Sequence, residues 1–295
     1  MKVHLNGRLI DERDAHISVL DRGFLFGDGV YEVVRFFARH GVGLDAHATR
    51  LARSLSLARI DSARHGFDPH ALGELCASLL EANALEDAIV YLQVTRGAAR
   101  SRSHVPTEPL APTVFAMATP APPLSTLVAA QEISAITAED TRWTRCEIKT
   151  TALLGNILHL LEAADSGAAE SILHRGGVVG EGAYSNVAIV TRGVLATPPI
   201  DEDPPILHGT ARADLLRAAR AAGIPSEVRT ITLDELTGAD EVMITSSSRL
   251  VSAVVRLDGR AVGDAKCGPL TARLFAAMRA DIAAASAART DAVPA

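Results

Sequence analysis

Lysine is scarce in this chain of 295 residues: only three lysines stand among 29 basic residues, and the others are arginine. A site that needs only positive charge could use any arginine. An amine that loses its proton and forms a Schiff base is something that arginine cannot supply. The three lysines are Lys2, Lys266 in a polar stretch near glycine, and Lys149. Composition alone therefore leaves two interpretations of Lys149, a catalytic amine or a solvated side chain at a strand end.

Cysteine is equally rare. Cys76, Cys146 and Cys267 lie far apart and lack the spacing of metal ligands, so the sequence predicts no metal site and a reduced, cytoplasmic protein. The sequence contains no N-terminal signal pattern and no apolar run long enough to span a bilayer, which argues against a membrane partner. The net charge is −6 and no long basic run is present, which argues against nucleic acid.

The chain has an ordinary globular composition, with 48% hydrophobic and 22% charged residues, and it is long enough for two domains. Three prolines at positions 120–123 cannot continue a strand or a helix. Strands and helices mix on both sides of them without a regular rhythm, which predicts an α+β fold. The predicted divisions are a small N-terminal α/β domain at 1–118, a Pro-rich linker at 119–126, a larger C-terminal domain at 127–282 and a disordered tail at 283–295.

A glycine turn, Gly27-Asp28-Gly29, precedes a β-branched and aromatic segment at 30–37 that is typical of a strand. Alternation along this strand places Tyr31 and Glu32 on opposite faces. A tyrosine just after a glycine turn can present its hydroxyl at a pocket, and it can equally be a packing residue. Residues 3–10 predict a β-hairpin that turns at Asn-Gly.

A basic loop follows a later predicted strand and contains Arg96, Arg100, Arg102 and His104 among serines and alanines. A guanidinium binds a carboxylate through two parallel hydrogen bonds, so this loop could trap an anion. It could also be an exposed basic loop. Both Arg100 and Arg102 are candidates for the carboxylate ligand.

Residues 207–212 open a predicted helix and include Gly209. Free N–H groups at a helix start, beside a glycine that permits close approach, form a phosphate site. The alternative is simple capping by Thr210. The hydroxyls of residues 245–248, after a predicted strand, add further donors.

Two charged residues, Arg50 and Glu181, stand in contexts that allow binding or solvation. Arg50 lies on a predicted helix, where it could be solvated or could bind phosphate. Glu181 precedes the small residues 182–183 and then a strand. Its carboxylate could lie close to a flat ligand or could belong to an ordinary turn.

Taken in order, these segments resemble the fold-type IV pyridoxal-phosphate (PLP) enzymes, the class IV aminotransferases, and within them the bacterial D-amino-acid group. The matching segments run through nearly the whole chain and are residues 21–34, 93–97, 142–149, 181–187 and 245–247. The resemblance implies a two-domain α+β architecture of fold type IV, a C-terminal domain that binds PLP, and a homodimer.

The resemblance also implies a role for each candidate residue. Lys149 would be catalytic, holding the cofactor as a Schiff base and moving the substrate proton. Glu181 would keep the pyridine nitrogen protonated, so that the ring withdraws electrons. The implied phosphate ligands are Arg50, Gly209, Thr210, Ala211 and Ser248. The implied ligands of the substrate carboxylate are Tyr31, Arg102 and His104, the last two supplied by the partner subunit.

The implied reaction is transamination of a D-amino acid such as D-alanine with 2-oxoglutarate, giving a 2-oxo acid and D-glutamate. Alternatives on the same fold are a lyase of the aminodeoxychorismate type and a branched-chain or (R)-amine transaminase. The Arg-x-His element at 102–104 favours transamination, and Ile157 stands where branched-chain members commonly have tyrosine. The chain departs from the pattern of the family at two points. Arg100 could replace Arg102 as the carboxylate ligand, and Ala211 stands where the group often has a hydroxyl.

Overall fold

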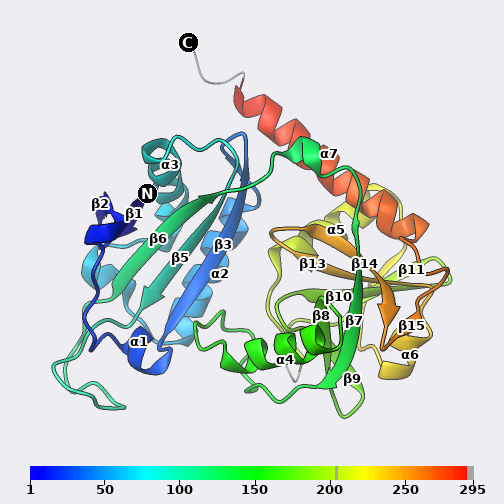
Figure 1. The fold of residues 1–295 in the computed structure, drawn as a ribbon, viewed down its shortest axis with the longest axis horizontal. Coiled ribbons are helices and arrows are strands. Elements are labelled where there is room, and N and C mark those ends of the chain that lie inside the picture. Colours follow the sequence, from blue (N-terminus) through cyan, green and yellow to red (C-terminus); the bar gives the residue numbers. More distant parts are fainter. Residues whose placement is uncertain (203–204, 291–295) are drawn as a thin grey trace. The chain divides into compact units, whose positions relative to one another are not determined.

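The computed structural model describes residues 1–202 and 205–290, apart from the side chains of residues 65, 289 and 290. The chain divides into two compact units, whose elements are labelled in Figure 1. Unit 1 contains Met1–Pro123, Ile148–Leu153 and residues 286–290. Unit 2 contains Leu124–Glu147 and Leu154–Ala285. Both helices and sheets are present, as expected for the predicted α+β class.

An antiparallel sheet forms the centre of unit 1, in the order β2-β1-β6-β5-β3-β4. Its strands are β1 (Lys2–Leu5), β2 (Arg8–Asp11), β3 (Gly29–Phe37), β4 (His40–Gly41), β5 (Ala88–Thr95) and β6 (Thr113–Pro120). The predicted hairpin is confirmed as β1 and β2. It turns at Asn6 and Gly7, whose φ angles of 50° and 81° suit the two central positions of a tight hairpin turn.

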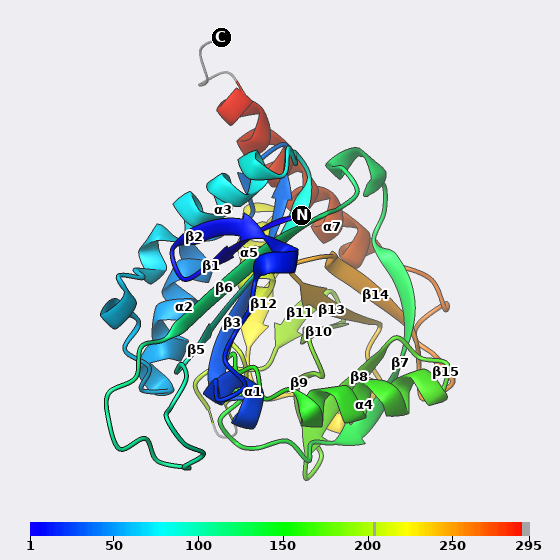
Figure 2. The same cartoon turned by 60° about the vertical axis from the view of Figure 1, so that its left-hand side comes forward.

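Two helices, α2 (Leu44–Leu57) and α3 (Leu72–Ala82), cover one face of this sheet (Figure 2). Apolar residues three and four positions apart give each helix one buried stripe, which includes Leu51 and Leu55 of α2 and Leu72 and Leu79 of α3. These stripes pack on alternate strand residues and form the core of the unit. Short helical segments lie at α1 (Arg22–Phe26), Glu12–Asp14, Ser62–His65 and Pro69–Ala71.

Unit 2 is built on a mixed sheet in the order β12-β11-β10-β13-β14-β7-β8-β9, with β15 also paired to β14. Its strands are β7 (Gln131–Glu139), β8 (Glu170–Arg175), β9 (Val178–Gly182), β10 (Asn186–Thr191), β11 (Val194–Thr197), β12 (Ser226–Val228), β13 (Glu241–Ser246), β14 (Leu250–Leu257) and β15 (Arg260–Ala261). Its helices are α4 (Leu154–Asp165), α5 (Thr210–Ala221), α6 (Leu233–Thr237), α7 (Pro269–Thr290) and a short turn at Leu124–Thr126. No helix within residues 1–202 and 205–290 is long and apolar enough to cross a membrane.

The structure differs from the predicted division of the chain in two places. Ile148–Leu153 clusters with unit 1, although the prediction placed it within the C-terminal domain at 127–282. Helix α7 continues to Thr290 through most of the predicted tail at 283–295, because its alanine-rich sequence favours helix. Residues 291–295 of that tail lie outside the described residues. The first break between units falls after Pro123, within the predicted linker at 119–126.

Candidate functional site

Lys149 lies in the short segment Ile148–Leu153 that joins unit 1. The Tyr31 N–H donates to the Lys149 carbonyl oxygen over 2.9 Å, and the Lys149 N–H donates to the Ser54 hydroxyl of α2 over 3.2 Å. Ile148 is buried in the same core as α2 and α3. The backbone of Lys149 is therefore held on β3 and α2 from both sides.

The amine of Lys149 lies over the ring of Tyr31, with Nζ 4.3 Å from the ring centroid. Such a contact between a cation and an aromatic face is weakly attractive. Among the described residues, this amine has no carboxylate partner and no hydrogen bond. Lys149 is therefore positioned by its backbone and by one aromatic face, and its nitrogen stays available to a carbonyl compound.

The glycine turn before β3 explains how the Lys149 segment can lie so close. Gly27 has a φ of 65°, in the left-handed region, and a Cβ built on it would lie 3.0 Å from Ala152 Cα. The Thr151 hydroxyl donates to the Gly27 carbonyl oxygen over 3.0 Å. A larger residue at Gly27 would be strained and would crowd Ala152. Glycine at this position therefore lets the segment that carries Lys149 lie close to the turn.

Arg50 belongs to a buried cluster with Glu32 and His47. Its Nε and Nη2 donate to the two oxygens of Glu32 over 2.8 and 2.7 Å, and His47 Nδ1 lies 2.6 Å from Glu32 Oε2. Burial alone raises the pKa of Glu32, but the charge and hydrogen bonds of Arg50, aided by His47, outweigh it and lower the pKa to about 2. Burial lowers the pKa of His47. Glu32 is thus an ionised carboxylate that orients the Arg50 guanidinium.

Replacing Glu32 with glutamine should remove an acid-sensitive part of the stability. A folded-state pKa near 2 means that the stabilisation is present above the ordinary value of 4.5 and is lost as the pH falls towards 2. The free energy of unfolding of the wild-type chain should exceed that of Glu32→Gln by on the order of 3 kcal/mol at pH 7. The two free energies should converge at low pH. Denaturant unfolding between pH 7 and 3 measures this difference. Glu86→Gln is the matched control, because Glu86 pairs with Arg39 at the surface; an equal loss there would show a general charge effect.

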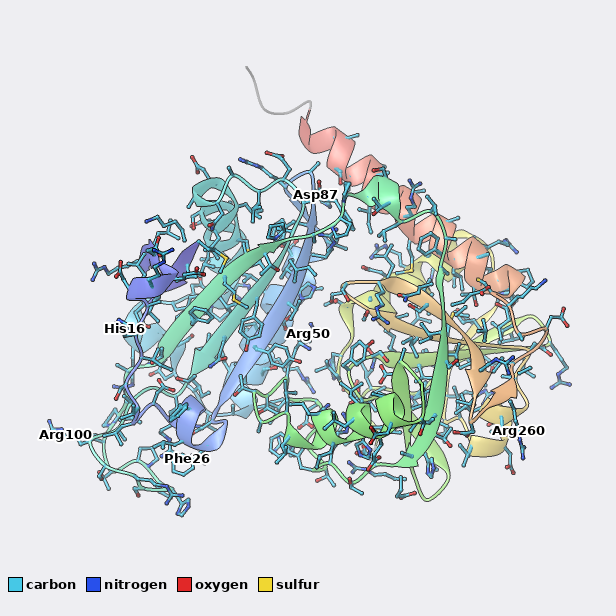
Figure 3. All side chains as sticks on the ribbon, viewed as in Figure 1. His16, Phe26, Arg50, Asp87, Arg100 and Arg260 are labelled. Atoms are coloured by element: carbon cyan, nitrogen blue, oxygen red, sulfur yellow. The ribbon has the colours of Figure 1, made fainter. Side chains whose placement is uncertain are left out.

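The predicted carboxylate ligands occupy two different places in unit 1. Tyr31 lies beside Lys149, whereas Arg102 Cζ lies 5.0 Å from the Phe26 ring centroid and the His104 ring lies 5.5 Å from the same ring. Figure 3 shows Phe26 at the end of the sheet where α1 precedes β3. Among the contacts of the described residues, none joins Arg102 or His104 to Tyr31 or Lys149.

Glu181 lies in unit 2 at the end of β9 and is 4% exposed. Its Oε2 accepts hydrogen bonds from the Leu207 N–H over 3.0 Å and from Asn186 Nδ2 over 3.3 Å. Its Oε1 accepts one from Arg142 Nη2 over 3.1 Å. Burial raises the pKa of Glu181, and the charge of Arg142 opposes that rise.

Arg142 is itself locked by a second carboxylate. Its Nε and Nη2 donate to the two oxygens of Asp140 over 2.9 and 3.0 Å, and Arg175 donates to the same carboxylate over 3.1 Å. Burial opposes the charge of Arg142, yet its bonds to Asp140 and the nearby charge of Glu181 raise its pKa. A permanently charged guanidinium is therefore fixed against one oxygen of Glu181.

The start of α5 meets a row of hydroxyls in unit 2. Gly209 is the N-cap and offers no side-chain cap, and N–H groups of a first helical turn have no partner within the helix. The Thr210 hydroxyl lies 3.4 Å from the Ser247 hydroxyl. A Cβ on Gly209 would collide with Asn186 Oδ1, so only glycine lets this turn lie beside Asn186. Ser247, rather than the predicted Ser248, contacts the helix start, and Ser248 is exposed.

These residues fit the cofactor that the resemblance implies. Thr245 pairs with Asn186 across β13 and β10, so their side chains share one face of the sheet. The Thr245 Oγ1 is buried and has no hydrogen-bond partner among the described residues. A helix start without a side-chain cap, an unsatisfied hydroxyl and a buried carboxylate suit a phosphorylated heteroaromatic ligand. Ala211 is buried and contributes its backbone alone.

The sequence did not single out Glu32, His47, Asp140, Arg142 or Asn186 for any role. One signal was present for Glu32, because it occupies the strand face that also carries Val34, and a charged side chain on a buried face needs a partner. No comparable signal existed for Arg142. It lies 39 positions before Glu181 in the sequence, and only the fold brings the two side chains together.

Comparisons with known proteins cover almost the entire chain. A profile of the family described as amino-transferase class IV matches residues 29–257. The D-alanine aminotransferase of Staphylococcus haemolyticus is 38% identical over 274 residues, which are 92% of this chain and 95% of that protein. The D-alanine aminotransferase of Listeria innocua is 41% identical over 275 residues, 93% of each chain. The branched-chain aminotransferase of Thermoproteus uzoniensis, solved with norvaline, has a TM-score of 0.85 at 27% identity and covers 96% of this chain and 94% of its own.

Proposed function

The chain belongs to the class IV aminotransferase family, and from this premise we propose that it is a PLP-dependent D-amino-acid transaminase. It transfers the amino group of a D-amino acid such as D-alanine to 2-oxoglutarate and gives a 2-oxo acid and D-glutamate. The observation that supports this most strongly is Lys149, the one lysine whose backbone is held by β3 and α2 and whose amine has no acidic partner among the described residues. The three cysteines are free thiols, which supports a reducing, cytoplasmic location.

Each residue of the candidate site has a defined task in this reaction. When bound, PLP supplies an aldehyde that takes the amino group and a ring that withdraws electrons. Lys149 would hold the cofactor covalently through its Nζ, and the same amine, once released, would carry the proton away from the substrate α-carbon. Glu181 would hold a proton on the ring nitrogen, and the charge of Arg142 favours the ionised form of that carboxylate.

The phosphate of the cofactor is assigned to the start of α5 with the neighbouring hydroxyls. Gly209, Thr210 and Ala211 provide the first turn of the helix, and Ser247 supplies a hydroxyl beside it. Ser248 is retained from the prediction as a more exposed donor. Arg50 adds a cation whose orientation is set by Glu32, which suits a fixed phosphate contact.

A homodimer is proposed from two features of the described residues. Helix α4 exposes an apolar stripe formed by Leu154, Ile157, Leu158 and Leu161. Each of these residues is at least 48% exposed. These positions share one helix face, and an exposed apolar stripe of this kind is typical of an interface. The second feature is the loop with Arg102 and His104, which packs on Phe26 and has no contact with Tyr31 or Lys149 among the described residues. In a twofold dimer, this loop serves the site of the other subunit.

The substrate carboxylate is assigned to Tyr31 together with Arg102 and His104 of the partner subunit. The contacts of the two candidate arginines favour Arg102, although both are exposed. The Arg100 side chain is 91% exposed and its Nε lies 3.4 Å from Glu108, whereas Arg102 packs on Phe26. A loosely held surface cation is a poor clamp, because ordering it on binding costs side-chain entropy. Arg102 is therefore the preferred ligand.

A single half-reaction tests this function. The purified protein, loaded with PLP, is mixed with D-alanine and no amino acceptor, and the visible absorption band of the bound cofactor is followed. We expect rapid loss of that band and release of pyruvate, because the amino group moves to the cofactor. L-Leucine and (R)-phenylethylamine should leave the band unchanged.

The same assay separates the alternatives. Loss of the band with L-leucine or the amine would move the protein to a branched-chain or (R)-amine transaminase. A stable band with every amine, combined with pyruvate release from aminodeoxychorismate, would show the lyase. A protein that takes up no PLP would contradict the proposal entirely.

A further inference from the structure

The loop that carries Arg102 and His104 is attached to the rest of unit 1 through α1. Arg22, the first residue of that helix, is 5% exposed. Its Nη1 donates to the Ser103 carbonyl oxygen over 2.5 Å and its Nη2 donates to the His104 carbonyl oxygen over 2.8 Å. One guanidinium therefore holds the backbone at the two positions immediately following Arg102.

Arg22 is fixed on its other side by a shared carboxylate. Its Nε donates to Asp28 Oδ2 over 2.7 Å, and Arg96 donates to both oxygens of Asp28 over 2.8 and 2.9 Å. Burial alone raises the pKa of Asp28, but the hydrogen bonds from Arg96 and Arg22 outweigh it and lower the pKa. Arg96 is bound in turn to the carbonyl oxygens of Ala58 and Arg59 at the end of α2. This chain of bonds ties the loop to the rigid part of the unit.

The last residue of α1, Phe26, holds the two side chains of the clamp. Arg22 Cζ and Arg102 Cζ lie 4.9 and 5.0 Å from the Phe26 ring centroid, and the His104 ring lies 5.5 Å from it. Guanidinium groups stack favourably on aromatic faces. Phe26 thus presents Arg102 and His104 together although the loop itself is exposed.

We propose that Arg22 and Phe26 are positioning residues for the substrate carboxylate. Arg22 fixes the backbone of the clamp and Phe26 fixes its side chains. This inference rests on the proposed function, since it assigns a purpose to the geometry of a carboxylate clamp. A preorganised clamp binds substrate without first ordering a loop, so the expected contribution is to the KM of D-amino acids rather than to the chemical step.

The test compares Arg22→Met, Phe26→Leu and Arg22→Lys with the wild-type holoenzyme. Arg22→Met removes the bonds to both loop carbonyls, and we expect the KM for D-alanine to rise about 10- to 100-fold with little change in kcat. Phe26→Leu keeps the Arg22 bonds and fills similar apolar space, and a smaller rise in KM is expected. Arg22→Lys should restore part of the loss, because an ammonium can reach Asp28 and one carbonyl. Arg100→Met, in the same loop, is the matched control and should match the wild type.

Two readouts that do not depend on turnover accompany the kinetics. The affinity for PLP and the visible band should be unchanged in all variants, because neither residue is assigned to the cofactor. Trypsin should cut the loop faster in Arg22→Met than in the wild type, since a backbone released from Arg22 unfolds locally more often and fits the protease more readily. Wild-type protein that gives no half-reaction with D-alanine would refute the proposed function. Wild-type activity with an unchanged KM and unchanged cleavage in Arg22→Met would refute only the positioning role.

Discussion

Replacing Lys149 with alanine is expected to lower the transamination of D-alanine by more than about a thousandfold, because Lys149 is the residue to which we assign both the covalent attachment and the proton transfer. The fold should persist. The backbone bonds from Lys149 to Ser54 and Tyr31 do not need its side chain, and the amine contacts only the Tyr31 ring. The measurements are turnover, the visible band of the covalently bound cofactor, and the thermal midpoint.

Lys266→Ala is the matched control for this prediction. Lys266 is an exposed lysine of unit 2, and its loss should leave turnover and the visible band unchanged. A Lys149→Ala variant that retained its band and more than a few per cent of its turnover would require another amine as the reactive group. Loss of activity accompanied by a large fall in the thermal midpoint would assign a structural role to Lys149 instead.

Lys149→Ala also allows the shared site to be tested across subunits. Mixed with Arg102→Met after unfolding and refolding, it should regain up to about a quarter of wild-type turnover, since half of the dimers are hybrids with one complete site each. In the proposed dimer, that site would take Lys149 from one subunit and Arg102 from the other. If the mixture recovered nothing while each variant still formed dimers, the clamp would belong to the same subunit as Lys149.

The second large effect is expected at Glu181. Glu181→Gln keeps the size of the side chain and an oxygen for Arg142, but an amide cannot hold a proton on the ring nitrogen, so turnover should fall about 100- to 10,000-fold. PLP should still bind, because the helix start and hydroxyls assigned to the phosphate are unchanged. Steady-state kinetics and PLP titration measure the two quantities separately. Comparable turnover in Glu181→Gln and the wild type would contradict the assigned role.

Arg142→Met provides a pH-dependent test of the same carboxylate. Burial raises the pKa of Glu181 and Arg142 opposes that rise, so removing Arg142 should raise the pKa further. The site needs an ionised Glu181, so the variant should lose activity at low pH and recover it as the pH rises through the new pKa. Arg145→Met is the matched control, because Arg145 is half exposed and pairs with Glu147. A flat pH profile of activity in Arg142→Met would show that Arg142 does not influence the ionisation of Glu181.

The sequence by itself determined the features that depend on local chemistry and on order along the chain. The Asn6-Gly7 hairpin follows from the positive φ angles that these two residues tolerate, and α2 and α3 follow from the spacing of their apolar residues. The order of the segments around Lys149 and Glu181 indicated the family, which the family profile and the relatives confirm. The fold-type IV architecture is likewise confirmed by the structural match.

Tertiary structure alone decided which charged groups meet. In the sequence, Arg50 had solvation as its default interpretation and phosphate binding as the functional one, whereas the fold places Glu32 and His47 against it. Arg100 and Arg102 have the same chemistry two positions apart, and only the packing of Phe26 separates them. The physical reason is that burial and ion pairing depend on residues distant in sequence, whereas turns and helical stripes depend on near neighbours. Lys149 illustrates both cases. The sequence predicted its role, whereas only the structure places it in unit 1.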